Sequence, residues 1–139
     1  MQILEKREFC YKSEHARIRT RQDMKRILRA FVYSFHGFVA TWRSEVAFRQ
    51  EVALFAIGLV VATLLPVGFL AKGLLIFSMI LVLLMELVNT AIESVVDRIS
   101  DANHPLSKKA KDIGSALVLI AFINAGIIWT AVILDSFID

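Results

Sequence analysis

Three long stretches without a charged residue constrain this chain more than any other feature of its sequence. They cover residues 52–71, 73–85 and 113–134. The second stretch continues to residue 96 with charges only at Glu86 and Glu93. Because about 20 apolar residues in a helix cross the roughly 30 Å hydrocarbon core of a bilayer, the sequence predicts an all-α membrane protein with three transmembrane helices. The expected spans are about residues 50–70, 73–99 and 112–135.

The composition excludes several other classes of protein. With 57% apolar residues and a mean hydropathy of +0.63, the chain is too apolar to be disordered. Six glycines and two prolines are too few for a compact all-β domain with many turns. A single cysteine excludes an intrachain disulfide, and three scattered histidines form no zinc-type cluster. The glycines form no Rossmann or P-loop nucleotide motif. We also expect no nucleic-acid partner.

The basic residues are unevenly distributed and predict the orientation in the membrane. Of the 16 Lys and Arg residues, 11 precede residue 50, and four more lie between Arg98 and Lys111. Because short basic segments stay in the cytoplasm, we expect the N-terminus and the 98–111 loop there and the C-terminus in the periplasm. An odd number of spans, here three, places the N-terminus and the C-terminus on opposite sides of the membrane, in agreement with this orientation.

Two segments precede the first span. Residues 1–23 are polar and mixed in charge, so we expect a disordered extension, with Met24 as an alternative translation start. From residue 24 to 43, apolar and basic side chains occupy opposite faces of a helix, as in a helix that lies in the membrane interface. Arg26 and Tyr33 lie about 20° apart on its polar face, which suits either simple anchoring or a paired contact with a ligand.

Polar side chains inside the second span are the strongest functional signal. At 100° per residue they share one face of the helix: Glu86, Asn89, Thr90, Glu93 and Asp97. Ionisable groups at membrane depth cost about 2.5–3.5 kcal/mol each, so such a stripe implies a site or a compensating partner. Spacing alone leaves open a lipid-modifying site, a polar seam between helices and a cation path. Glu86 is expected about 10 Å deeper than Glu93.

Three motifs resemble one known family. "EVAFRQE" (45–51), "MELVNTAIESVVDRI" (85–99) and "AKDIGSALVLI" (110–120) closely resemble segments of the small bacterial integral-membrane diacylglycerol kinases. The resemblance runs from about residue 25 to the C-terminus. It implies three spans and a surface helix in each protomer, a homotrimer with shared active sites, and a location in the bacterial inner membrane. It also implies transfer of the γ-phosphoryl group of ATP, with Mg²⁺ as cofactor, to diacylglycerol to make phosphatidate.

The resemblance carries roles to individual residues. It implies that Glu86 is the catalytic base and that Glu45 and Glu93 bind magnesium. The implied nucleotide-binding residues are Arg26, Tyr33, Glu45, Glu93, Lys111 and Asp112. The implied lipid-binding residues are Phe48, Arg49, Gln50, Glu86, Ser115 and Trp129. Asn89 and Asp97 match supporting polar positions. In the loop before His104, Ala102 stands where some relatives have an acidic residue and Asp101 is displaced by one position, which weakens the case for a nucleotide contact there.

Two other functions remain as alternatives. Undecaprenol kinases share the acids but resemble "ERNMRIH" where this chain has "EVAFRQE", although "HPLSKKAKD" is closer to their pattern. A small oligomeric cation channel or transporter would also place acids along a transmembrane stripe. Such a channel would not need Arg26, Lys111 and Asp112 at the cytoplasmic surface.

Overall fold

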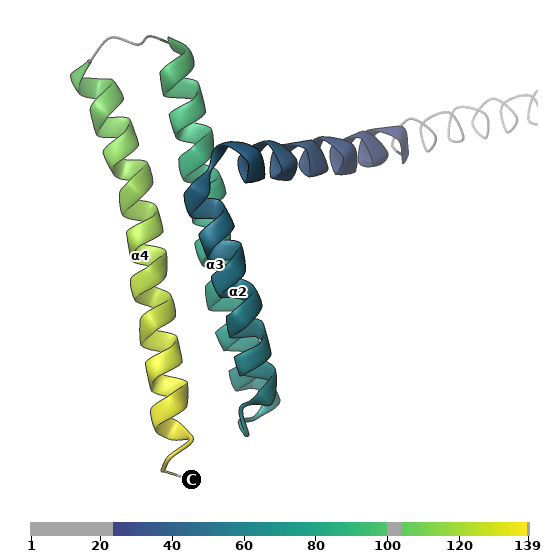
Figure 1. Cartoon of the computed structure of the whole chain (residues 1–139), viewed down its shortest axis with the longest axis vertical. Helices are drawn as coiled ribbons and strands as arrows, with labels where there is room; N and C mark the ends of the chain where they lie inside the picture. The colour runs from purple at the N-terminus through teal and green to yellow at the C-terminus, as the bar shows by residue number, and fades with distance from the viewer. Residues whose placement is uncertain (1–23, 100–103, 139) are drawn as a thin grey trace, which may run out of the picture. The chain divides into compact units, whose positions relative to one another are not determined.

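The computed structural model describes residues 24–99 and 104–138, and all regular structure in this part of the chain is helical. The chain divides into two compact units, Met1–Ala40 and Thr41–Asp139. The second unit contains three long helices, α2 (Val46–Leu64), α3 (Phe69–Ile99) and α4 (Pro105–Asp135) (Figure 1). The predicted all-α class is confirmed for the described residues. The expected N-terminal extension and the loop positions Asp101 and Ala102 lie outside them.

Among the described residues, 24–44 form one helix, of which residues 24–40 belong to the first unit. Its apolar side chains, such as Phe31 and Phe35, are largely exposed, as are Arg26 and the phenol ring of Tyr33. The helix thus has the length and the uncovered apolar side chains expected of an interfacial helix. Its placement in a membrane surface remains a prediction.

The start of α2 follows a sharp break at Glu45, whose backbone is extended (φ −102°, ψ 119°). The Arg49 guanidinium donates hydrogen bonds to the carbonyl oxygens of Trp42 (2.8 Å) and Arg43 (3.5 Å). Carbonyls in the last turn of a helix have no partner within that helix, so a cation is favourable there. Arg49 therefore stabilises the bend that leads into α2.

The helix ends explain why the spans differ from the sequence expectation. Helix α2 ends at Leu64, short of the expected residue 70, because Leu65 precedes Pro66 and has an extended ψ of 136°. Lys72 of α3 donates to the Thr63 carbonyl (2.7 Å) and satisfies one group at that end. Helix α4 begins at Pro105, earlier than the expected residue 112, and the His104 imidazole accepts a hydrogen bond from the Leu106 amide (3.2 Å).

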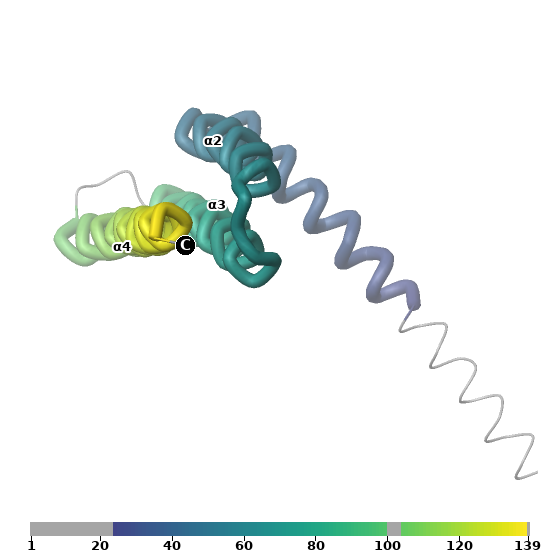
Figure 2. The backbone as a smooth tube through the Cα atoms, turned by 90° about the horizontal axis from the view of Figure 1, so that it is seen from below, coloured from purple at the N-terminus to yellow at the C-terminus, as the bar shows by residue number. Residues whose placement is uncertain are grey.

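Helix α3 is the centre of the second unit and packs against both α2 and α4 (Figures 1 and 2). The contact faces are built from small or flexible side chains, among them the fully buried Ala62, Leu75 and Ser78. Small residues let helix backbones approach closely, which is the usual basis of helix association in membranes. The helix packing needs no large hydrophobic core.

Most of the remaining apolar surface of these helices is exposed. Ile57, Phe77 and Leu119 are each more than half exposed, and the three helices have mean hydropathies of 1.6, 2.3 and 2.5 over their most apolar windows. Each is long and apolar enough to cross a membrane. Residues 24–99 and 104–138 therefore contain three helices that could span a membrane, as the sequence predicts.

Candidate functional site

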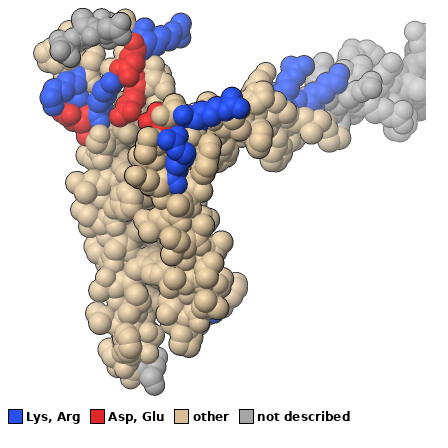
Figure 3. Space-filling model, in the orientation of Figure 1, with Lys and Arg blue, Asp and Glu red and all other residues tan. Residues whose placement is uncertain are grey.

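The predicted acidic stripe occupies the end of α3 that leads toward α4. Glu86 and Asn89 are buried, Glu93 is half-buried and Asp97 is exposed, so exposure rises toward the end of the helix. Figure 3 shows the acidic and basic side chains of the bundle gathered at this end, while the rest of the visible face is almost uncharged. The site therefore extends from the exposed end of α3 into the apolar part of the bundle.

Helix α2 adds two more carboxylates to this stripe. Glu45, at the start of α2, is half-buried, and both Glu45 and Glu93 are close enough to Glu86 for their charges to interact. Glu51 is buried, also interacts with Glu86, and its Oε2 atom has no hydrogen-bond partner within the described residues. Three carboxylates, two from the start of α2 and one from α3, are therefore close enough to Glu86 to interact with its charge. Such a cluster favours a cation or a proton donor, because like charges in a poorly solvated site repel strongly.

Helix α4 supplies the basic side of the site. Lys111 Nζ lies 2.5 Å from Asp97 Oδ1, and its charge also interacts with Glu93. Lys108 and Asp112 form a second pair at 2.6 Å, one helical turn apart. Both pairs are at least partly exposed, and exposed ion pairs contribute little to stability because water screens them. Lys111 and Asp112 can therefore exchange these partners for charged groups of a ligand at little cost.

Asn89 links the buried and exposed parts of the stripe. Its Nδ2 atom donates to Glu93 Oε1 (3.3 Å), while its buried Oδ1 has no hydrogen-bond partner in the described part of the chain. Oδ1 lies directly against Gly114 of α4, where a Cβ atom would clash with it. The absence of a side chain at residue 114 thus lets α3 and α4 approach at the site and leaves room for the Asn89 amide.

The carboxylate oxygens of this site are the kind of ligand that magnesium prefers. Residues 24–99 and 104–138 contain no cluster of three or more His, Cys, Asp or Glu side chains that could enclose a metal ion. Magnesium needs no such cage, because it keeps several waters and is usually held by one or two carboxylates plus phosphate oxygens. Glu45 and Glu93, whose charges both interact with that of Glu86, are carboxylates of this kind.

Comparison with known proteins decides the family. The family model described as prokaryotic diacylglycerol kinase matches residues 32–133 of the chain. The chain belongs to the prokaryotic diacylglycerol kinase family. The diacylglycerol kinase of Escherichia coli (strain K12) is 46% identical over 112 residues, which are 81% of this chain and 92% of the relative. That of Pseudomonas aeruginosa is 46% identical over 111 residues (80% and 90%), and that of Helicobacter pylori (strain 26695) is 43% identical over 108 residues (78% and 84%).

Membership of the prokaryotic diacylglycerol kinase family confirms the resemblance seen in the sequence motifs. Together with the three apolar helices, it makes the chain a multi-pass membrane protein of bacterial type. The family match also covers every element of the second unit up to residue 133. The carboxylate cluster therefore lies within the part of the chain that defines the family.

The predicted lipid-binding residues of this kinase-family chain are spread along the bundle, and their role stays a prediction. Gln50 lines a small hollow beside Glu86, whereas Phe48 is buried in the helix packing. Ser115 donates to the Lys111 carbonyl of its own helix (3.2 Å). Trp129 lies 14 residues after Ser115, about 21 Å further along α4. Arg49 donates hydrogen bonds to carbonyls at the end of the preceding helix, so the contacts seen here stabilise the fold. Its predicted lipid contact remains a prediction.

Other predicted residues have different outcomes. Arg26 and Tyr33 lie in the first unit, so their role at the nucleotide stays a prediction. Sequence reasoning assigned no role to Glu51, although an acid directly before a charge-free run was a usable signal. It also missed Gly114, whose importance depends on which helix lies opposite and has no signal in helical periodicity.

Proposed function

We propose that this chain transfers the γ-phosphoryl group of ATP to the primary hydroxyl of diacylglycerol, producing phosphatidate and ADP. The observation that carries the proposal is the convergence of Glu45, Glu51 and Glu93 around the buried Glu86, in a chain whose relatives are named diacylglycerol kinases. A membrane-buried base beside water-accessible charged groups suits a reaction between a lipid alcohol and a soluble nucleotide.

Glu86 is the proposed general base. It lies seven residues before Glu93, about 10 Å deeper along α3, where a lipid hydroxyl can reach it from within the membrane. The hydroxyl oxygen attacks the γ-phosphorus, the bond from that phosphorus to the β–γ bridging oxygen breaks, and the hydroxyl proton passes to the Glu86 carboxylate. ADP leaves with the bridging oxygen.

The nucleotide is proposed to lie at the exposed end of the stripe. Glu45 and Glu93 would hold Mg²⁺, which when bound neutralises phosphate charge and orients the triphosphate. Lys111 exchanges its exposed partner Asp97 for a phosphate oxygen, and Asp112 contacts the nucleotide beside it. By family resemblance, Arg26 and Tyr33 are also proposed to bind the nucleotide. Positioning and charge neutralisation of this kind can replace a P-loop.

Orientation and assembly belong to the same proposal. The charged end of the bundle faces the cytoplasm, where ATP is available, so the N-terminus is cytoplasmic and the C-terminus periplasmic. The exposed apolar faces of α2, α3 and α4 are available to lipid and to other copies of the chain. By family resemblance, the assembly is a homotrimer with shared active sites. The relatives' names do not favour the polyprenol kinase or channel alternatives.

Product identification tests this function. Purified protein in mixed micelles is given Mg²⁺, ATP labelled in the γ-phosphoryl group and diacylglycerol, and the lipids are then separated. We expect labelled phosphatidate and one ADP for each phosphatidate formed. Label released only as inorganic phosphate, or no label in the lipid, would show that the site does not transfer phosphate to this alcohol.

A further inference from the structure

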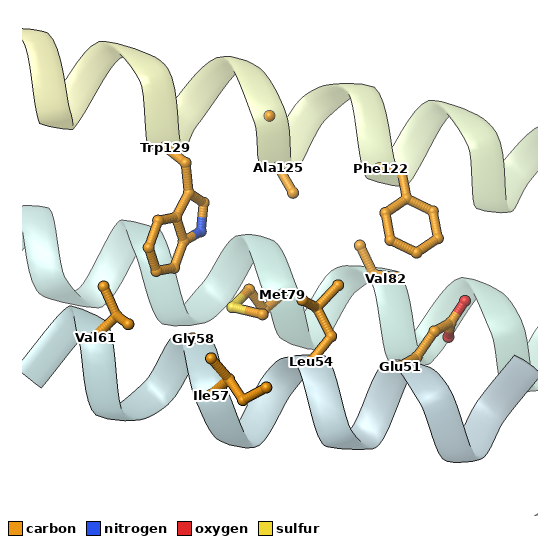
Figure 4. A pocket seen from close by; sticks show the side chains of 11 residues that line it. Glu51, Leu54, Ile57, Gly58, Val61, Met79, Val82, Phe122, Ala125 and Trp129 are labelled. Atoms are coloured by element: carbon orange, nitrogen blue, oxygen red, sulfur yellow. The ribbon is translucent and has the colours of Figure 1, made fainter.

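An apolar groove opens between α2, α3 and α4 in the uncharged part of the bundle (Figure 4). It has a volume of about 360 Å³ and is lined from all three helices, by Leu54, Gly58 and Val61 of α2, Met79 of α3, and Phe122 and Trp129 of α4, among others. Among the described residues that line it, only Glu51, at one end, is ionisable. The groove therefore suits an apolar ligand that carries a polar group at that end.

The groove adjoins the small hollow that contains Glu86, the proposed base. The small hollow that contains Glu86 shares Glu51, Leu54 and Phe122 with the groove. From Glu51 to Val61 the groove follows ten residues of α2, about 15 Å. That length is about half of the roughly 30 Å hydrocarbon core, which is the depth of the acyl chains of one leaflet. A lipid whose hydroxyl lies at Glu86 would direct a chain along this path.

The middle of the groove depends on a close approach between Gly58 and Met79. A Cβ atom on Gly58 would clash with Met79 Sδ, lie 2.5 Å from Met79 Cε and lie 3.4 Å from Trp129 Cζ2. Because residue 58 has no side chain, the Met79 thioether can lie against α2 and leave the groove open beside Trp129. Methionine is unbranched and flexible, so a larger residue at 58 would displace Met79 rather than the helix backbone.

We propose that Gly58 and Met79 determine how long an acyl chain of the lipid substrate this groove accepts. The inference rests on the proposed lipid kinase function and adds the substrate class that the groove selects. An acyl chain fits better than a helix from a second copy, because the groove runs directly from the hollow that contains Glu86 and has the length of one leaflet. A side chain at residue 58 pushes Met79 into the groove and shortens it.

Chain-length selectivity tests this role. The ratio of kcat/KM for dioleoylglycerol to that for dioctanoylglycerol is measured for wild type, Gly58→Ala, Gly58→Leu, Met79→Ala and the Gly58→Ala/Met79→Ala double variant. We expect Gly58→Leu to lower the ratio about tenfold and Gly58→Ala to lower it less, since single-methylene differences in apolar pockets change efficiency about 10- to 200-fold. Met79→Ala raises the ratio, and in the double variant it restores the ratio that Gly58→Ala lowers.

A matched control separates the groove from a general effect on helix packing. Gly73 is also in a helix, and a Cβ atom there meets nothing within 4 Å. Gly73→Leu should leave the chain-length ratio unchanged. An unchanged ratio in both Gly58 variants would overturn the proposal. So would a change of oligomeric state in Gly58→Leu with no change in ratio, because it would assign the groove to contact between copies.

Fluorescence quenching tests groove occupancy without catalysis. The chain has two tryptophans, so Trp42→Phe leaves Trp129 in the groove as the single fluorophore. Diacylglycerol with brominated acyl chains should quench this emission, and Gly58→Leu should reduce the quenching. If wild type phosphorylates no diacylglycerol, the proposed function fails; if Trp129 is quenched no more by brominated diacylglycerol than by a brominated bulk phospholipid, the groove assignment fails by itself.

Discussion

Replacing Gly114 by alanine tests how the packing of α3 against α4 positions Glu93, the proposed magnesium ligand. The new Cβ atom would clash with Asn89 Oδ1 and lie 3.4 Å from Asn89 Cγ, so the amide must rotate or shift. Movement of the amide breaks the 3.3 Å hydrogen bond from Asn89 Nδ2 to Glu93 Oε1. Glu93 then loses the neighbour that orients its carboxylate. We therefore expect Gly114→Ala to weaken magnesium and ATP binding while the fold persists.

The magnitude follows from the two effects of the substitution. A hydrogen bond to a charged group contributes about 1.5–3 kcal/mol, and the long, partly exposed bond here belongs at the lower end. A loss of about 1.4 kcal/mol corresponds to a tenfold rise in the magnesium concentration for half-maximal activity. Overpacking costs about 1–3 kcal/mol of stability, and the gain in helix propensity from Gly to Ala offsets about 1 kcal/mol of it. Folding should therefore be largely retained.

The assay is a magnesium titration of kinase activity, with the KM for diacylglycerol measured in parallel. We expect the magnesium midpoint and the KM for ATP to rise about tenfold while the KM for diacylglycerol stays near wild type. Gly73→Ala is the control, since its Cβ atom meets nothing within 4 Å. If Gly114 acts through Asn89, adding Gly114→Ala to Asn89→Ala has little further effect. A wild-type magnesium midpoint in Gly114→Ala would refute this reasoning.

Three further predictions, on three substitutions and one deletion, test the proposed roles. Glu86→Gln should fold and bind ATP but lose nearly all phosphoryl transfer, because it removes the base and keeps the shape; near-wild-type turnover in mixed micelles would contradict this. Glu45→Gln and Glu93→Gln should each raise the magnesium midpoint, since each removes one anionic ligand, and unchanged midpoints in both would argue against the metal assignment. Deletion of residues 1–23 should leave activity and trimer formation intact, and failure to assemble on size exclusion in detergent would show a structural role.

Helical periodicity was sufficient to predict the polar face of α3. The positions of Glu86, Asn89, Glu93 and Asp97 around one helix depend only on local geometry, and their graded burial follows the predicted depth. The three apolar helices were likewise evident, because hydrocarbon thickness requires long uncharged runs. Local rules could not supply the ends of these helices, which depend on Pro66, Pro105 and the cap at His104.

Contacts between helices could not be predicted from periodicity. The role of Gly114 against Asn89, and that of Gly58 against Met79, depends on which residues lie opposite each glycine across the bundle. Arg49 is a further case: the resemblance implies a lipid contact, which stays a prediction, and the structure adds that its guanidinium binds the carbonyls at a helix end, which periodicity could not predict. The sequence of one helix shows which residues share a face. Only the packed structure shows which residues of another helix lie against that face.

A competition assay tests most directly whether the protein, with Glu86 as base, transfers phosphate from ATP to diacylglycerol. Purified protein receives equimolar diacylglycerol and undecaprenol with γ-labelled ATP, and the two labelled products are quantified from one reaction. We predict a kcat/KM at least about tenfold higher for diacylglycerol, which corresponds to about 1.4 kcal/mol of differential transition-state binding. Equal or higher efficiency with undecaprenol would contradict the named substrate, and label in neither lipid would contradict the kinase assignment itself.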